Sequence, residues 1–106
     1  MRNPTDPARM RAHAGEAAAL LKALANEQRL LILCHLAEGE LPVGALQERV
    51  GLGQSALSQH LARLRAHGLV ATRREAQAIH YRLADGPVRA LMGTLHGIYC
   101  APHRRR

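Results

Sequence analysis

A polar helix face between residues 54 and 68 carries the side chains best suited to recognition chemistry. The stretch "QSALSQHLARLRAHG" mixes Ser, Gln, His and Arg with regularly spaced leucines. At about 100° per residue, Leu57, Leu61 and Leu64 form one stripe that must face a core, and Gln59 lies opposite. Gln and Arg can read base edges, whereas Ser and His can bind phosphate. The face therefore fits a DNA major groove, unless it is the solvated side of an ordinary helix.

Basic residues continue on a predicted hairpin that follows this helix. A short helix ending in "GLG" precedes it, which gives helix–turn–helix spacing, and Arg73 and Arg74 lie on the hairpin where a wing would stand. The expected DNA-binding residues are Gln54, Ser55, Ser58, Gln59, His60, Arg63, Arg73, Arg74 and Gln77. Together these elements predict a mainly α protein with a β-hairpin, a winged helix–turn–helix of five helices plus a wing.

The charge balance supports a polyanionic partner. The chain of 106 residues has a formal net charge of +7, and Lys22 is the lone lysine among its 15 basic residues. Arginine binds phosphate with a planar fork of donors, so this composition favours nucleic acid, although genome composition could also enrich arginine.

The two cysteines are a second source of chemistry. Two cysteines do not make a disulfide scaffold, and Cys34 shares a helical face with Leu30 and Leu33. Cys100 lies at the end of the last predicted helix. Both could be inert small hydrophobes, or either could be a nucleophile. No positioned base or cleft-forming α/β pattern accompanies them, so we do not expect an enzyme.

Metal-ligand patterns are broken. A thiolate site would need paired cysteines close together, and Cys34 stands alone. A site on the last helix would need a His two residues after Asp85, but Pro87 stands there. His96 and His103 are then left without partners for a metal site. His35 beside Cys34 leaves a non-standard site open. We expect no metal and no other cofactor.

The elements that position these groups are delimited by capping residues. We expect a flexible arm over 1–13, a DNA-binding and dimerisation domain over 14–100, and a basic tail over 101–106. Asn26 predicts a helix start, Gly39, Gly51 and Gly68 predict helix ends, and Asp85 predicts the cap of the last helix. The expected helices span 14–25, 27–39, 42–51, 54–68 and 85–100, with a hairpin around "EAQ" in 69–84.

No apolar run approaches the roughly 20 residues of a membrane span, and no signal peptide is visible. We therefore expect a cytoplasmic protein with no membrane partner.

The segments "LANEQRLLILCHL" and "LPVGALQERVGLGQSALSQHLARLRAHGLVATRREAQAIHYRL" resemble the ArsR/SmtB family of dimeric bacterial repressors. The resemblance covers about residues 16–100 and rests on the combination of "S-x-L-S-x-H-L-x-x-L", "GLV" and the arginine-bearing hairpin. The cysteines of "LILCHL" and "LHGIYC" resemble its reactive-sulfur-sensing branch, the SqrR/BigR-like and HlyU-like regulators.

The resemblance implies a homodimer that binds an inverted-repeat operator in double-stranded DNA. The first and last helices would form the interface, with Leu20, Leu91, Leu95, Ile98 and Tyr99 as its residues. It also implies that Cys34 and Cys100 face each other within one subunit, so that reactive sulfur species could bridge them and release the DNA. A metal-responsive repressor and a ligand-independent DNA-binding protein remain the alternatives.

Overall fold

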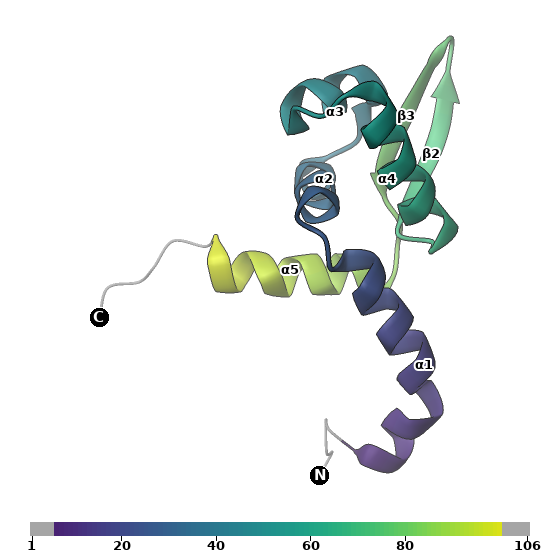
Figure 1. Ribbon diagram of the computed structural model, residues 1–106, viewed down its shortest axis with the longest axis vertical. Helices are drawn as coiled ribbons and strands as arrows, with labels where there is room; N and C mark the ends of the chain where they lie inside the picture. The colour runs from purple at the N-terminus through teal and green to yellow at the C-terminus, as the bar shows by residue number, and fades with distance from the viewer. Residues whose placement is uncertain (1–5, 101–106) are drawn as a thin grey trace, which may run out of the picture.

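Eight elements follow one another through residues 6–100, the part of the chain that the computed structural model describes (Figure 1). In chain order they are α1 (Pro7–Leu24), α2 (Glu27–Glu38), β1 (Leu41–Pro42), α3 (Val43–Val50), α4 (Gln54–Ala66), β2 (Val70–Glu75), β3 (Ala78–Leu83) and α5 (Pro87–Tyr99). This order confirms the predicted fold of five helices with a hairpin before the last. Strand β1 has no counterpart in the prediction.

Most predicted helix ends coincide with their capping residues. The Asn26 side chain accepts a hydrogen bond from the Arg29 backbone N–H at 3.0 Å, which satisfies one open donor at the start of α2. Gly51 and Gly68 follow α3 and α4 with φ of 72° and 71°, a left-handed conformation that glycine adopts at low cost. The predicted Asp85 cap is wrong, because Gly86 occupies that position and no side chain caps α5.

The start of α1 corrects the predicted arm. Asp6 accepts hydrogen bonds from the backbone N–H groups of Ala8 and Arg9 at 3.0 and 3.4 Å, and Pro7 fits the first helical position. This local cap begins the helix at Pro7, so residues 7–13 are helical rather than a flexible arm. Residues 1–5 of the arm and the predicted tail at 101–106 lie outside the described residues.

The wing is an antiparallel sheet with strand order β1–β3–β2. Its β2–β3 ladder runs from Val70 opposite Leu83 to Glu75 opposite Ala78, so the turn is shorter than the predicted "EAQ" loop and contains residues 76–77. On the other edge of β3, Pro42 pairs with His80. Side chains alternate between the two faces of a strand, so Arg73 and His80 share the face opposite to that of Val70.

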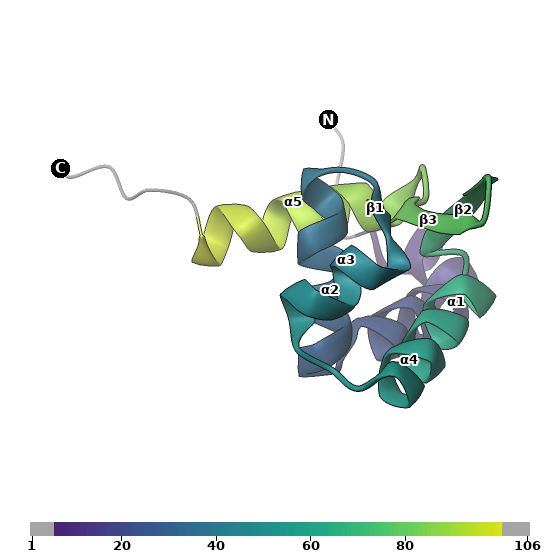
Figure 2. The ribbon, with the colours of Figure 1, turned by 90° about the horizontal axis from the view of Figure 1, so that it is seen from above.

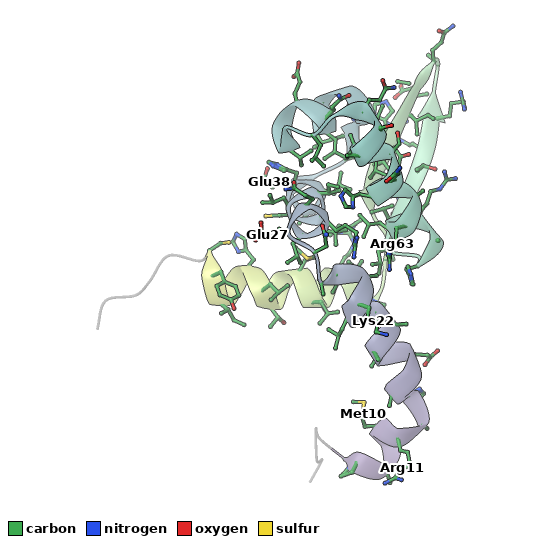
Figure 3. All side chains as sticks on the ribbon, in the orientation of Figure 1. Met10, Arg11, Lys22, Glu27, Glu38 and Arg63 are labelled. Carbon is green, nitrogen blue, oxygen red and sulfur yellow. The ribbon has the colours of Figure 1, made fainter. Side chains whose placement is uncertain are left out.

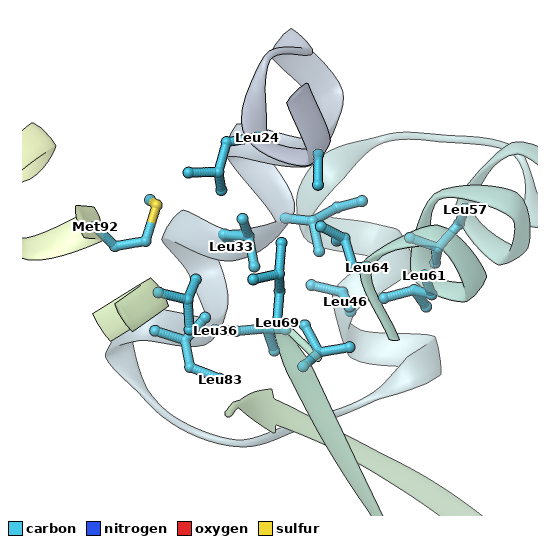
Figure 4. Packing of buried hydrophobic residues seen from close by; sticks show 14 residues of the cluster. Leu24, Leu33, Leu36, Leu46, Leu57, Leu61, Leu64, Leu69, Leu83 and Met92 are labelled. Atoms are coloured by element: carbon cyan, nitrogen blue, oxygen red, sulfur yellow. The ribbon is translucent and has the colours of Figure 1, made fainter. Parts of the chain in front are cut away.

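Leucines from α2, α4 and the sheet form the core (Figure 4). Leu57, Leu61 and Leu64 are buried, which confirms the apolar stripe predicted for residues 54–68. Val88 and Met92 attach the first half of α5 to the same core. The core therefore holds α4 with its polar side outward.

Arg29 joins α1 to α2 from inside the protein. It is the one polar residue among the buried residues of the described chain. Its Nε donates to the Ala23 carbonyl at 2.6 Å and its Nη2 donates to the Lys22 carbonyl at 3.2 Å, so it satisfies carbonyls at the end of α1. Burial lowers the pKa of Arg29, and the nearby Arg63 lowers it further.

Two helices extend away from this body. Figures 1 and 2 show α1 and α5 leaving it in different directions, so that much of each helix has no neighbouring element. The helices of residues 6–100 include none that is long and apolar enough to cross a membrane.

Candidate DNA-binding face and cysteine pocket

The exposed side of α4 presents most of the predicted DNA-binding residues. The exposed members are Gln54, Ser55, Ser58, Gln59 and Arg63. Gly53 stands at the N-cap position without a side-chain hydrogen bond, so the first backbone N–H groups of α4 are open to an external acceptor. The face thus combines amide, hydroxyl and guanidinium donors on one rigid helix.

His60 is less accessible than the rest of this set. It is half-buried, and its burial lowers its pKa, as do the positive charges of Arg29 and Arg63. The imidazole is therefore neutral over a wider range of pH than an ordinary histidine. A phosphate near it would favour the charged form and raise the pKa again.

The wing separates its two neighbouring arginines. Arg73 is held by Glu40, whose Oε1 accepts from Nη2 at 2.7 Å and from Nε at 2.9 Å, and its Nη1 lies 3.0 Å from the carboxylate of Glu75. These contacts raise the pKa of Arg73, and the hydrogen bond from Arg73 lowers the pKa of Glu40. Arg74 is exposed and has no ion pair or side-chain hydrogen bond within residues 6–100. The predicted Gln77 is exposed in the turn.

Cys34 and Cys100 line one cavity between α2 and α5. Both thiols are free, Cys34 is half-buried on α2, and Cys100 is exposed where α5 ends. This cysteine pocket has a volume of about 410 Å³, and its walls are Cys34, Ala37, Glu38, Leu83, Arg89, Met92, Gly93, His96 and Cys100. Figure 3 shows Glu38 on the side of α2 that faces the end of α5.

Glu38, Arg89 and His96 line the cysteine pocket beside the two thiols, and the sequence predicted no role for them there. Arg89 donates through Nη2 to the Leu83 carbonyl at 3.1 Å, and its Nε lies 3.5 Å from Asp85. His96 precedes Cys100 by one helical turn, a spacing that places both on one side of α5 and that the sequence itself could have indicated. Within residues 6–100 no group of three or more His, Cys, Asp or Glu side chains is arranged to hold a metal ion.

The residues predicted for a dimer interface divide into two sets. Leu20, Leu91 and Leu95 are half-buried against the core, whereas Ile98 and Tyr99 are 58% and 78% exposed. Exposed Met10 and Leu21 on α1 add apolar surface that the sequence reasoning did not single out. An apolar groove of about 330 Å³ lies between these helices, lined by Leu21, Leu24, Ala25, Leu30, Leu91, Thr94 and Leu95.

Comparison with known proteins gives consistent results at the levels of sequence and structure. Residues 26–72 match the family model described as "Bacterial regulatory protein, arsR family". The transcriptional activator HlyU of Vibrio cholerae is 52% identical over 97 residues, which cover 92% of this chain and 90% of that protein. The biofilm growth-associated repressor of Xylella fastidiosa is 43% identical over 91% of this chain and 84% of its own length.

Solved structures of similar proteins have the same fold as this chain. Reduced HlyU from Vibrio cholerae superposes with a TM-score of 0.83 at 53% identity, covering 88% of this chain and 98% of that one. The homodimeric winged helix–turn–helix domain Mb0332 of Mycobacterium bovis has a TM-score of 0.74 at 33% identity, covering 99% and 100% of the two chains.

Proposed function

Because this chain belongs to the arsR family of bacterial regulatory proteins, we propose that it is a homodimeric repressor that reactive sulfur species release from DNA. As a member of this family it is a DNA-binding transcriptional regulator and not an enzyme. Its direction of regulation is part of the proposal, because one relative is named an activator and another a repressor. The observation that carries the switch is the single cavity lined by Cys34 and Cys100.

The proposed DNA contact uses α4 in the major groove and the wing beside it. Gln59 and Arg63 would read base edges, and Ser55 and Ser58 would bind phosphate. A twofold dimer would present two copies of α4 to an inverted-repeat operator. Support for the dimer comes from the exposed apolar residues of α1 and α5 and from the homodimeric Mycobacterium relative.

The proposed switch is sulfur transfer followed by bridging. One thiol attacks the outer sulfur of a low-molecular-weight persulfide, RSSH, which forms a protein persulfide and releases RSH. The other thiol then attacks the cysteine Sγ of this protein persulfide, which closes a disulfide and releases the outer sulfur as H₂S. Each further sulfur inserted into the bridge consumes one more RSSH and releases one more RSH, so the persulfide is the only oxidant required.

A bridge between Cys34 and Cys100 would join α2 to the end of α5. Helix α2 packs against α4, whereas α5 carries the exposed residues assigned to the dimer interface. The bridge would therefore change the position of each α4 relative to the dimer axis. The dimer could then no longer bind both half-sites of the operator at once.

Persulfide treatment of the intact protein tests this function. We expect the reduced protein to bind a DNA site selected from a random pool. It should lose that binding as its mass falls by two hydrogens and gains one sulfur atom for each sulfur inserted into the bridge. Peptide mapping should link residues 34 and 100 within one subunit. Release by zinc without a mass change would favour a metal-responsive repressor, and binding indifferent to both agents would favour a ligand-independent DNA-binding protein.

Substitutions at Gln59 and Arg74 separate sequence reading from phosphate binding. We expect Gln59→Ala to weaken binding to the selected site by about 1–3 kcal/mol while non-specific binding stays the same, because only a base contact is lost. Arg74→Ala should weaken both kinds of binding and reduce the salt slope by about 1. Arg11→Ala is the charge-matched control, since Figure 3 shows Arg11 at the far end of α1. Parental binding by both variants would contradict the assignment.

A further inference from the structure

We propose that Glu40 is a built-in competitor for DNA phosphate, which occupies the wing arginine Arg73 until DNA replaces it. The ligand that would displace it is a backbone phosphate of the bound duplex. The inference rests on the proposed DNA contact of the wing, and it is independent of the cysteine bridge.

The contacts of Arg73 are those of a phosphate site that already holds an anion. One oxygen of Glu40 receives two guanidinium N–H groups, at 2.7 and 2.9 Å, which is a charge-assisted arrangement that a phosphate oxygen can reproduce. Arg73 itself is exposed on β2, so its guanidinium can be reached from solvent.

The sheet brings Glu40, His80 and Arg73 together. Glu40 directly precedes β1, whereas Arg73 lies on β2, and the side chain of Arg73 must cross β3 to reach it. His80 stands between them on β3, opposite both Pro42 and Arg73, with its Nδ1 3.9 Å from the Glu40 carboxylate. The Glu40 side chain is 27% exposed, compared with 63% for Glu75, so Glu40 is the more shielded of the two anions that contact Arg73.

Exchange of Glu40 for phosphate is energetically accessible. A solvent-exposed ion pair contributes little to stability, because water and salt screen it and both side chains lose freedom when it forms. Binding of an arginine to DNA phosphate gains the release of condensed counterions. Arg74, which is held by no such pair among the described residues, would bind phosphate without this competition.

Glu40→Gln tests the competition because it removes the charge and keeps the shape. We expect it to bind a random-sequence duplex about two- to five-fold more tightly than the parent, with a salt slope steeper by up to about 0.9. Glu40→Ala should increase the affinity for the duplex by at least the same factor. Fluorescence anisotropy across a salt series measures both quantities, and circular dichroism with thermal melting establishes that each variant is folded.

Two comparisons isolate the effect from the general change in charge. Glu16→Gln is the matched control, since Glu16 lies on α1 and pairs with His13 rather than with the wing. Arg73→Ala should cost little in the parent, yet it should cancel the gain of Glu40→Gln in the double variant. Binding by Glu40→Gln that is weaker than the parent, or no tighter than Glu16→Gln, would overturn the proposal. If Arg74→Ala also left DNA binding unchanged, the proposed contact between the wing and DNA would itself be wrong.

Discussion

Cys34→Ser and Cys100→Ser will each bind the selected DNA site when reduced, and neither will release it after persulfide treatment. A bridge requires a thiol at both positions, so either variant can accept sulfur but cannot close the link across the cysteine pocket. The expected loss of response is complete rather than partial. Electrophoretic mobility shift with and without RSSH, next to intact-mass measurement, gives the result for each variant.

The chain has only these two cysteines, so the double serine variant provides a thiol-free baseline. Cys100 is exposed, and its replacement should leave the stability of the fold unchanged. Cys34 packs against the core, so Cys34→Ala is the companion variant that keeps an apolar side chain there. Release of DNA by persulfide in any single variant would exclude the two-thiol bridge and favour a one-thiol mechanism.

Ile98→Glu and Leu95→Glu will produce monomers and lose tight binding to the selected site. Each places a charge on the apolar side of α5 that we assign to the twofold interface, where burial of an unpaired carboxylate is costly. Because two linked half-sites bind far more tightly than one, we expect affinity to fall by about 100-fold or more. Sedimentation equilibrium and anisotropy measure the two effects.

Ile98 is the more informative position, because it is 58% exposed in the subunit and its substitution should not unfold it. Leu95 also lines the apolar groove and packs against the core, so its variant tests the groove and the interface together. Val43→Glu, at an exposed apolar residue of α3, adds the same single negative charge outside the assigned interface and is the control for the oligomeric state. A folded Ile98→Glu dimer with parental affinity would exclude α5 as the interface.

The parts of this fold that the sequence predicted are those determined locally. The Asn26 cap, the left-handed glycines after α3 and α4 and the leucine stripe of α4 depend on neighbours within a few residues, and each is where its pattern indicated. The start of α1 has the same kind of signal, Asp6 followed by Pro7, but the scattered arginines and prolines around it are equally typical of a flexible arm.

The contacts that the sequence does not predict join distant segments. Glu40 and Arg73 are separated by 33 residues and meet because the short strand β1 pairs with β3, an arrangement that a two-residue strand does not reveal in sequence. The shared pocket of Cys34 and Cys100 likewise depends on how α5 packs on α2, and only the family resemblance implied it. The burial of Arg29 is not predictable from its position, because an arginine at the start of a helix ordinarily remains in solvent.

Helix α5 forms one wall of the cysteine pocket and also carries the exposed surface that we assign to dimer assembly. Under the proposed switch, this shared helix makes sensing and operator occupancy thermodynamically reciprocal. If a disulfide bridge weakens operator binding by a given factor, the operator must disfavour that disulfide by the same factor, which raises the reduction potential of the thiol pair by about 60 mV for each hundredfold. Protein on its operator would then require a higher dose of reactive sulfur than free protein, so the abundance of operator sites would set the threshold at which the response begins.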